Sequence, residues 1–268
     1  MSLWFAALLG LIQGLTEFLP ISSSAHLRIA PALFGQPDPG PAFTAVIQLG
    51  TLAAVIAYFA KDLVNLTGAM FRDPTGPEGR LPLLIAAGTI PIVVAGLVLK
   101  KHIEGDLRSL YVTASVLIGF SLVMLLIDRY AAGRDSTKPL AAITLADAML
   151  IGLSQTLALV PGVSRSGATI CMALLVGLSR SDSARFSFLL SIPAVAGAGI
   201  FELKDAMKGL GTDAIPALAV GTGVAAVTGY VSIAWLMKWL GSHDLIVFVV
   251  YRILAGLSLL GALLCQVL

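Results

Sequence analysis

Six polar side chains gather at a break in the first apolar region of the chain. They are Gln13, Glu17, Ser22, Ser23, Ser24 and His26. Gln13 and Glu17 are four residues apart, so they share one face of a helix. The serines follow Pro20 at a point where serine is a favoured helix N-cap, and His26 lies one turn after Ser22. A carboxylate can hold a metal or a proton, and a histidine can act as nucleophile, base or acid, so this break predicts a catalytic site.

A second break carries hydroxyl groups and one permanent charge. Pro161 and Gly162 are followed by Ser164, Arg165, Ser166 and Thr169. The N-terminus of a helix offers free backbone N–H groups and the positive end of its dipole, so it binds anions. The planar guanidinium of Arg165 matches phosphate, and Thr169 lies one turn further along. The second break therefore predicts a phosphate-binding site.

Each break also has a purely structural interpretation. The first fits a capped hairpin around a hydrogen-bonded His26, and Arg165 fits a charge that reaches toward the membrane surface. The capped hairpin does not require Glu17, however, and Arg165 lies between 17 and 14 uncharged residues. We therefore favour one shared site for a phosphate ester or anhydride with an apolar tail. Because a carboxylate repels phosphate, Glu17 there indicates a bridging divalent cation or a bound proton.

The composition places these residues in a membrane protein. Of 268 residues, 57% are hydrophobic and 12% are charged, whereas soluble domains carry about 25% charged residues. The formal net charge of +2 is too small to indicate a nucleic-acid partner. The first residues lack a basic segment and Glu17 interrupts their apolar run, so we do not expect a cleavable signal peptide.

Six stretches are long enough to cross a bilayer, which takes about 20 mostly apolar residues. They cover 39–60, 81–99, 109–127, 181–201, 214–237 and 245–268. Two further apolar regions, 3–34 and 147–179, each read as a short helix, a break and a second short helix. Such re-entrant hairpins are tolerated where they line a protein cavity. The predicted fold is an all-α integral membrane protein with six transmembrane helices plus two re-entrant helical hairpins.

The connections between the spans are polar. They lie at 61–80, 100–108 and 128–139. We expect the first to be a loop, because its part from 68 to 80 holds two prolines and three glycines. The loops at 61–80, 128–138 and 180–185 and the turn at 238 carry nine basic residues, against six on the other side. The positive-inside rule then puts the first hairpin on the outer face.

The two halves of the chain resemble each other. A shift of 142 positions aligns Gly10, Gln13 and Ser22 with Gly152, Gln155 and Ser164, and slightly different shifts align Phe43 with Phe186 and Gly88 with Gly221. This series predicts one membrane domain, 1–268, built from two repeats at about 1–140 and 141–268. Each repeat holds one hairpin and three spans, and since three is odd, the second repeat is inverted. Inverted-topology repeats place a site near the midplane, where the broken helices meet.

Both breaks carry specific motifs. The stretch QGLTEFLPISSSAH at 13–26 resembles the glutamate-rich signature of the undecaprenyl-diphosphatase family, also called bacitracin resistance proteins. PGVSRSGATI at 161–170 resembles the second signature of that family, and the stretches at 177–198 and 249–254 (VVYRIL) are also similar to it. The resemblance covers nearly the whole chain and implies the same six spans, two re-entrant hairpins and inverted repeat.

The resemblance also implies a role for each candidate residue. Glu17 and Gln13 become the acidic pair and the metal region, with a divalent cation, Mg²⁺ or Ca²⁺, as cofactor. Many relatives carry glutamate where this chain has Gln13, which removes one charge. The implied catalytic residues are Glu17, Ser22, Ser23, His26 and Arg165, and the implied diphosphate cradle is Ser24, Ser164, Arg165, Ser166 and Thr169. Arg252, inside the last span, fits a functional and a structural role equally well.

The implied activity is hydrolysis of undecaprenyl diphosphate to undecaprenyl phosphate and inorganic phosphate, which recycles the lipid carrier for cell-wall synthesis and confers bacitracin resistance. The implied location is the bacterial inner membrane, with the site opening to the periplasmic face. A flippase or transporter of polyprenyl phosphate is the main rival, and a phosphatase of another lipid phosphate is a second. His26 and Glu17 together favour a hydrolase, because a carrier needs no acid, base or nucleophile. Serine, histidine and water all remain candidate nucleophiles, and the sequence is compatible with a homodimer.

Overall fold

The computed structural model describes residues 1–104, 109–134, 136–209 and 214–266. Helices make up most of these ranges, and no strand element occurs within them. The all-α class predicted from the sequence is therefore confirmed, together with the membrane-protein character that the apolar helices carry.

Six long helices coincide with the six predicted spans. They are α3 (Gly40–Tyr58), α5 (Leu81–Glu104), α6 (Leu110–Ala132), α9 (Arg180–Gly209), α10 (Ile215–Trp239) and α11 (Ile246–Leu264). Among the described residues, all of these except α9 are apolar enough over sufficient length to cross a membrane. Helix α9 is 30 residues long but begins with Arg180, Asp182 and Arg185. Helices α5 and α6 also extend into the connectors predicted at 100–108 and 128–139, of which residues 105–108 lie outside the described ranges.

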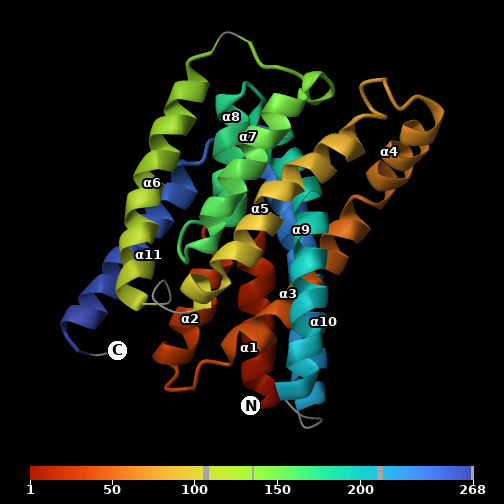
Figure 1. The fold of residues 1–268 in the computed structure, drawn as a ribbon. Coiled ribbons are helices and arrows are strands. Elements are labelled where there is room, and N and C mark those ends of the chain that lie inside the picture. The colour runs from red at the N-terminus through yellow and green to blue at the C-terminus, as the bar shows by residue number, and fades with distance from the viewer. Residues whose placement is uncertain (105–108, 135, 210–213, 267–268) are drawn as a thin grey trace.

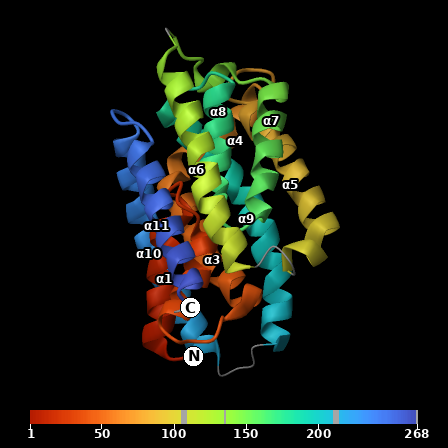
Figure 2. The same cartoon turned by 90° about the vertical axis from the view of Figure 1, so that its left-hand side faces the viewer.

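Each interrupted region forms a pair of short helices. Helices α1 (Leu3–Glu17) and α2 (Ser23–Leu33) form the first pair. After the short 3-10 helix η2 (Leu140–Ala142), the second pair consists of α7 (Leu145–Gln155), the 3-10 helix η3 (Thr156–Leu159) and α8 (Arg165–Leu175). The two pairs enter the molecule from opposite ends, with α1 at the end that holds the N-terminus (Figure 1 and Figure 2). Both helix–break–helix predictions are confirmed.

The predicted loop at 61–80 is wrong in its first part. Residues Ala60–Arg72 form helix α4, which follows α3 directly. Gly68 is the only glycine within it, and both prolines of the segment come after its end. Asp62 in the first turn and Arg72 in the last turn complement the helix dipole. The segment 61–80 therefore begins as a helix, although its last residues are rich in proline and glycine.

Close contacts between glycines join the two halves in matching ways. A Cβ added to Gly10 of α1 would lie 2.2 Å from the carbonyl oxygen of Gly221 in α10. A Cβ added to Gly152 of α7 would lie 1.9 Å from the carbonyl oxygen of Gly88 in α5. Small residues let membrane helices approach closely at such points. The sequence aligns Gly10 with Gly152 and Gly221 with Gly88, so the two contacts are equivalent in the two halves. They support the internal duplication, which stays a prediction.

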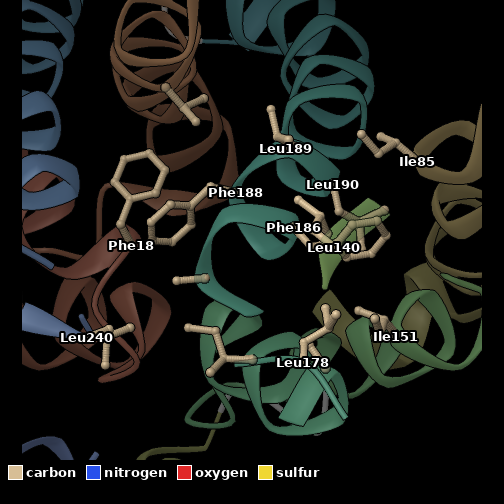
Figure 3. Packing of buried hydrophobic residues seen from close by; sticks show 14 of the residues in the cluster. Phe18, Ile85, Leu140, Ile151, Leu178, Phe186, Phe188, Leu189, Leu190 and Leu240 are labelled. Carbon is tan, nitrogen blue, oxygen red and sulfur yellow. The ribbon is translucent and has the colours of Figure 1, made fainter. Parts of the chain in front are cut away.

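A buried aromatic contact ties the first hairpin to α9 (Figure 3). Phe18, the residue after Glu17, and Phe188 of α9 meet edge to face with their ring centroids 5.2 Å apart. Both side chains are buried. Such a ring pair contributes about 0.5–1.5 kcal/mol beyond the burial of its area. The core thereby holds the end of α1, and with it Glu17, against α9.

We expect Gly152→Ala to destabilise the protein, because its methyl group would overlap the backbone of Gly88, which cannot move aside like a side chain. Overpacking of this kind costs about 1–3 kcal/mol. Gly223→Ala in α10 is the matched control, because a Cβ there meets nothing within 4 Å. The measurement is thermal unfolding of both variants in detergent. Equal unfolding temperatures for the two variants would contradict the close approach of α5 and α7.

Candidate active site

Glu17 is the last residue of α1, and its side chain is almost fully buried. Its Oε2 accepts hydrogen bonds from Gln13 Nε2 at 2.9 Å and from Ser23 Oγ at 2.7 Å. Its Oε1 accepts from Arg165 Nη2 at 3.0 Å, which forms an ion pair between the two breaks. A buried charge is stable only when it is paired and hydrogen-bonded, and here Glu17 meets both conditions. The two breaks are therefore in direct contact.

Both breaks turn at a serine with a left-handed backbone. Ser22 has a φ of 75° and Ser164 a φ of 77°, a conformation that strains a residue other than glycine. In each break the serine Oγ lies 3.1 Å from the Oγ of the serine two residues further on, Ser24 or Ser166. Ser164 also caps α8, because its Oγ accepts from the N–H of Gly167 at 3.2 Å. Two similar turns thus present the N-termini of α2 and α8.

A cavity of about 170 Å³ lies where the two turns meet. Its polar wall consists of Glu17, Ser22, Ser23, Ser24, Gln48, Ser164 and Arg165. Its apolar wall consists of Ile92, Ala158, Leu159, Ala194, Val195 and Ala198. The structure therefore brings most of the predicted site residues to one cavity, with one carboxylate and one guanidinium among them.

Arg165 begins α8 and lines the cavity. Nη2 donates to Glu17, whereas Nη1 is buried and has no hydrogen-bond partner within the described part of the chain. The first backbone N–H groups of α8 lack partners inside the helix and carry the positive end of its dipole. Nη1 and the α8 N-terminus can together bind an oxyanion of phosphate size.

Two predicted phosphate-binding residues lie beside the cavity and do not line it. Ser166 donates from its Oγ to the carbonyl oxygen of Leu19 in the first break, at 3.1 Å. Thr169 is fully buried, donates to the carbonyl oxygen of Arg165 at 2.8 Å and lies 2.6 Å from Ser187 Oγ on α9. These hydroxyls hold the turn that carries Arg165 against the first hairpin and α9.

His26 of α2 contacts α11. Its Nδ1 lies 2.8 Å from the carbonyl oxygen of Ser22, which can only accept, so Nδ1 carries a proton. In a neutral ring Nε2 is then unprotonated, and it accepts a hydrogen bond from the hydroxyl of Tyr251 at 2.7 Å. The two rings stack with centroids 5.6 Å apart. His26 therefore offers a basic nitrogen that is held by Tyr251 and does not line the cavity.

Arg252 of α11 binds both breaks at once. Its fully buried guanidinium donates from Nη1 to the carbonyl oxygen of Pro20 at 3.3 Å and from Nη2 to that of Gly162 at 2.7 Å. Nε donates to Ser121 Oγ on α6 at 2.8 Å. These contacts support the structural interpretation of Arg252, because one side chain holds the two turns at a fixed separation.

Residues 6–258, which include both breaks, match the model of a protein family described as bacitracin resistance protein BacA. The chain belongs to this family. A protein of Myxococcus xanthus (strain DK1622) is 52% identical over 97% of this chain and 89% of its own length. A protein of Chlorobaculum parvum (strain DSM 263 / NCIMB 8327) is 48% identical over 97% of this chain and 96% of its own length. A protein of Corynebacterium diphtheriae (strain ATCC 700971 / NCTC 13129 / Biotype gravis) is 47% identical over 95% and 92%. All three are named undecaprenyl-diphosphatase.

This member of the BacA family offers a metal only one carboxylate at the cavity. Across the described residues, no three His, Cys, Asp or Glu side chains form a cluster. Besides Glu17, the oxygen Oε1 of Gln13 is fully buried and lacks a hydrogen-bond partner among these residues. Oxygen donors suit Mg²⁺ and Ca²⁺, and Mg²⁺ is commonly held by one or two carboxylates plus substrate phosphates. Gln13 does not line the cavity, and both oxygens of Glu17 already accept hydrogen bonds, so Glu17 is the one described carboxylate at the cavity that a cation could share with a substrate phosphate.

Two residues of this site were missed in the sequence. Gln48 of α3 lines the cavity, and Tyr251 of α11 binds His26. Each is a polar group inside a predicted span, which is a general signal for function in a membrane segment. Gln48 has no neighbouring motif, and the VVYRIL stretch that contains Tyr251 does not show which face of its helix that residue occupies. Only the packing of α3 and α11 against the hairpins reveals their roles.

A larger cavity of about 380 Å³ lies at the end of the molecule where α6, α8 and α10 terminate. Arg134 and Arg180 line it, but both are engaged in structural contacts. Arg134 donates to the carbonyl oxygens of Leu174 and Leu175 at the end of α8, and Arg180 forms an ion pair with Asp128. The smaller cavity, which both breaks line, is therefore the candidate site.

Proposed function

We propose that this chain hydrolyses undecaprenyl diphosphate to undecaprenyl phosphate and inorganic phosphate. Relatives that match nearly the whole chain are named undecaprenyl-diphosphatase. The observation that carries the proposal is the Arg165–Glu17 ion pair, at a cavity lined by the N-termini of two broken helices. The enzyme recycles the lipid carrier for cell-wall synthesis and confers bacitracin resistance.

The terminal phosphate binds between the two turns. Arg165 Nη1 and the backbone N–H groups at the start of α8 donate to its oxygens, and the hydroxyl of Ser24 reaches it from the first turn. These donors are fixed before the substrate arrives, because Ser166, Thr169 and Arg252 hold the turns. Preorganised donors stabilise the charge that develops during phosphoryl transfer.

Ser23 and Glu17 are the best-placed nucleophile and base. The Ser23 hydroxyl donates to Glu17 Oε2 at 2.7 Å, so the carboxylate can take the proton as Oγ attacks the terminal phosphorus. The bond from that phosphorus to the bridging oxygen breaks, and undecaprenyl phosphate leaves with the bonding electrons. Water then releases inorganic phosphate from Ser23. A water that attacks directly, with Glu17 as base, gives the same products.

His26 takes part as the second proton carrier. Its Nε2 is held by the Tyr251 hydroxyl, and its Nδ1–H by the Ser22 carbonyl in the turn that bears Ser23. On leaving Tyr251, the ring can accept a proton at Nε2 from attacking water, and as the imidazolium it can then deliver that proton to the leaving phosphate oxygen. Ser22 belongs to the same turn, and its Oγ forms a hydrogen bond with the Oγ of Ser24.

A lipid flippase is the alternative activity. Inverted hairpins that meet at mid-depth are suited to transport as well as to hydrolysis. A carrier needs donors for an anion, but it does not need a carboxylate hydrogen-bonded to a serine hydroxyl. The Ser23–Glu17 contact and the names of the relatives both favour the hydrolase.

The proposed location is the bacterial inner membrane, with the site open to the periplasmic face. Nine basic residues lie in α4 or in and beside the connections α4–α5, α6–α7, α8–α9 and α10–α11, which supports a cytoplasmic position for that end. The first hairpin enters from the opposite end, beside the N-terminus (Figure 1). A homodimer also stays a prediction.

A divalent cation at Glu17 is the proposed cofactor, with Gln13 Oε1 as a second oxygen donor. It would offset the repulsion between the carboxylate and the diphosphate. We expect a chelator to reduce phosphate release from purified protein strongly, and added Mg²⁺ or Ca²⁺ to restore it. Full turnover in excess chelator would instead mean that Arg165 alone neutralises Glu17.

Arg165→Lys tests whether the two parallel N–H donors of the guanidinium are needed. Lysine keeps the charge but cannot donate to Glu17 and to a phosphate oxygen in parallel directions. We expect phosphate release to fall about 100-fold, the scale seen when one preorganised donor is lost. Arg129→Lys on the exposed face of α6 is the matched control and should retain activity. Substantial rescue by lysine would show that only the charge matters.

His26→Ala should lower kcat by at least about 100-fold, the usual scale for an acid or base group. KM should change much less, because His26 does not line the cavity. His243→Ala, in the exposed turn between α10 and α11, is the control. Near-normal turnover of the His26 variant would leave this residue a structural role beside Tyr251.

A further inference from the structure

The cavity has room for a phosphate head group but not for a polyprenyl chain. Its volume of about 170 Å³ is below the roughly 300–1,000 Å³ of a pocket that encloses a drug-sized ligand. If the substrate is a polyprenyl diphosphate, as proposed above, its chain must leave the cavity sideways, between helices. Two neighbouring helices must therefore lie far enough apart for the chain to pass between them.

The two halves of the molecule provide two comparable flanks. Beside the first hairpin lie α3 and α10, and beside the second lie their counterparts α9 and α5. The flank between α3 and α10 is closed by backbone contact. A Cβ on Gly50 of α3 would lie 2.2 Å from the carbonyl oxygen of Thr222, and one on Gly229 of α10 would lie 3.2 Å from Thr51. No chain can pass between helices at this separation.

The flank between α5 and α9 is open along part of its length. The helices meet near Gly88, where an added Cβ would lie 3.2 Å from Leu190 of α9. Further along, Cβ atoms on Gly96 of α5 and Gly197 of α9 would meet nothing within 4 Å. Figure 1 shows α5 tilting away from α9 toward its C-terminal end. On the offset that pairs Phe43 with Phe186, Ala198 corresponds to Val55, yet Ala198 is exposed and Val55 is buried.

The apolar wall of the cavity lies at this open flank. Ile92 comes from α5, Ala158 and Leu159 from η3, and Ala198 from α9. The polar lining of the same cavity includes Glu17 and Arg165, whose Nη1 is unpaired among the residues described. A head group bound at Arg165 therefore lies next to an apolar path that leads toward the exposed side of α9.

We propose that the gap between α5, η3 and α9 is the portal through which the polyprenyl chain of the substrate reaches the bilayer. Small side chains at Ala158, Ala194 and Ala198 leave width for a branched isoprenoid chain. The path is apolar, so the chain passes from cavity to lipid without meeting an unpaired polar group. The portal selects for a long apolar chain by the contact it makes with the isoprene units that follow the first.

Ala198→Trp tests the portal by narrowing it from the exposed side of α9. The substrates are undecaprenyl diphosphate and isopentenyl diphosphate, whose single isoprene unit is short enough to stay in the cavity. We expect kcat/KM for the long substrate to fall at least 10-fold, mainly through KM, and that for the short substrate to change less than 3-fold. Ala53→Trp on the exposed face of α3, the counterpart of α9, is the matched control and should affect neither.

Equal effects of Ala198→Trp on the two substrates would overturn the portal, whether both rates were kept or both were lost. A second measurement does not depend on turnover or on this variant. The probe is a non-hydrolysable polyprenyl methylenediphosphonate with a diazirine on its second isoprene unit, applied to the unmodified protein. We expect photolabelling of peptides from α5, η3 and α9, and labelling confined to α3 and α10 would overturn the portal. A wild-type protein that releases no phosphate but labels at α5 and α9 would refute the proposed hydrolysis and retain the portal.

Discussion

The ion pair between Glu17 and Arg165 is the interaction on which the rest of the site depends. Neither charge is stable alone at this depth in the protein, because an unpaired buried charge is expensive to desolvate. The pair forms only if α1 and α8 end at the same point, although 148 positions separate the two residues. The remaining polar contacts of the breaks, from Gln13 and Ser23 on one side and Ser166 on the other, surround this pair.

The helices that position the pair are set by close backbone contacts. Gly10 against Gly221 and Gly152 against Gly88 bring each hairpin onto a long helix of the other half. Side chains larger than hydrogen do not fit at these crossings, so glycine fixes the depth of both hairpins. Arg252 then sets the distance between the turns through the carbonyl groups of Pro20 and Gly162. The geometry of the candidate site is thus a consequence of helix packing.

The two repeats are similar in sequence, but the helix pairs that flank their hairpins pack differently. Helices α3 and α10 are in backbone contact, whereas α5 diverges from α9 beyond Gly88. The two hairpins also carry different polar residues at aligned positions. Gln155 in the second hairpin aligns with Gln13 but is buried without a hydrogen-bond partner in the described ranges, and Leu159 stands where the first hairpin has Glu17. One half therefore supplies the carboxylate and the other supplies the guanidinium.

The sequence by itself determined the membrane class, the long spans, the two broken helices and the residue types at the breaks. These features follow from local composition, because a bilayer demands apolar runs and makes every polar interruption costly. It did not determine that α4 is a helix, that His26 binds Tyr251, that Thr169 binds Ser187, or that Gln48 faces the cavity. Helix α4 begins inside a segment whose later prolines and glycines predicted a loop. The other three features depend on which helix faces lie together after packing, and only the tertiary structure decides that, because uncharged spans carry no signal for their rotation about the helix axis.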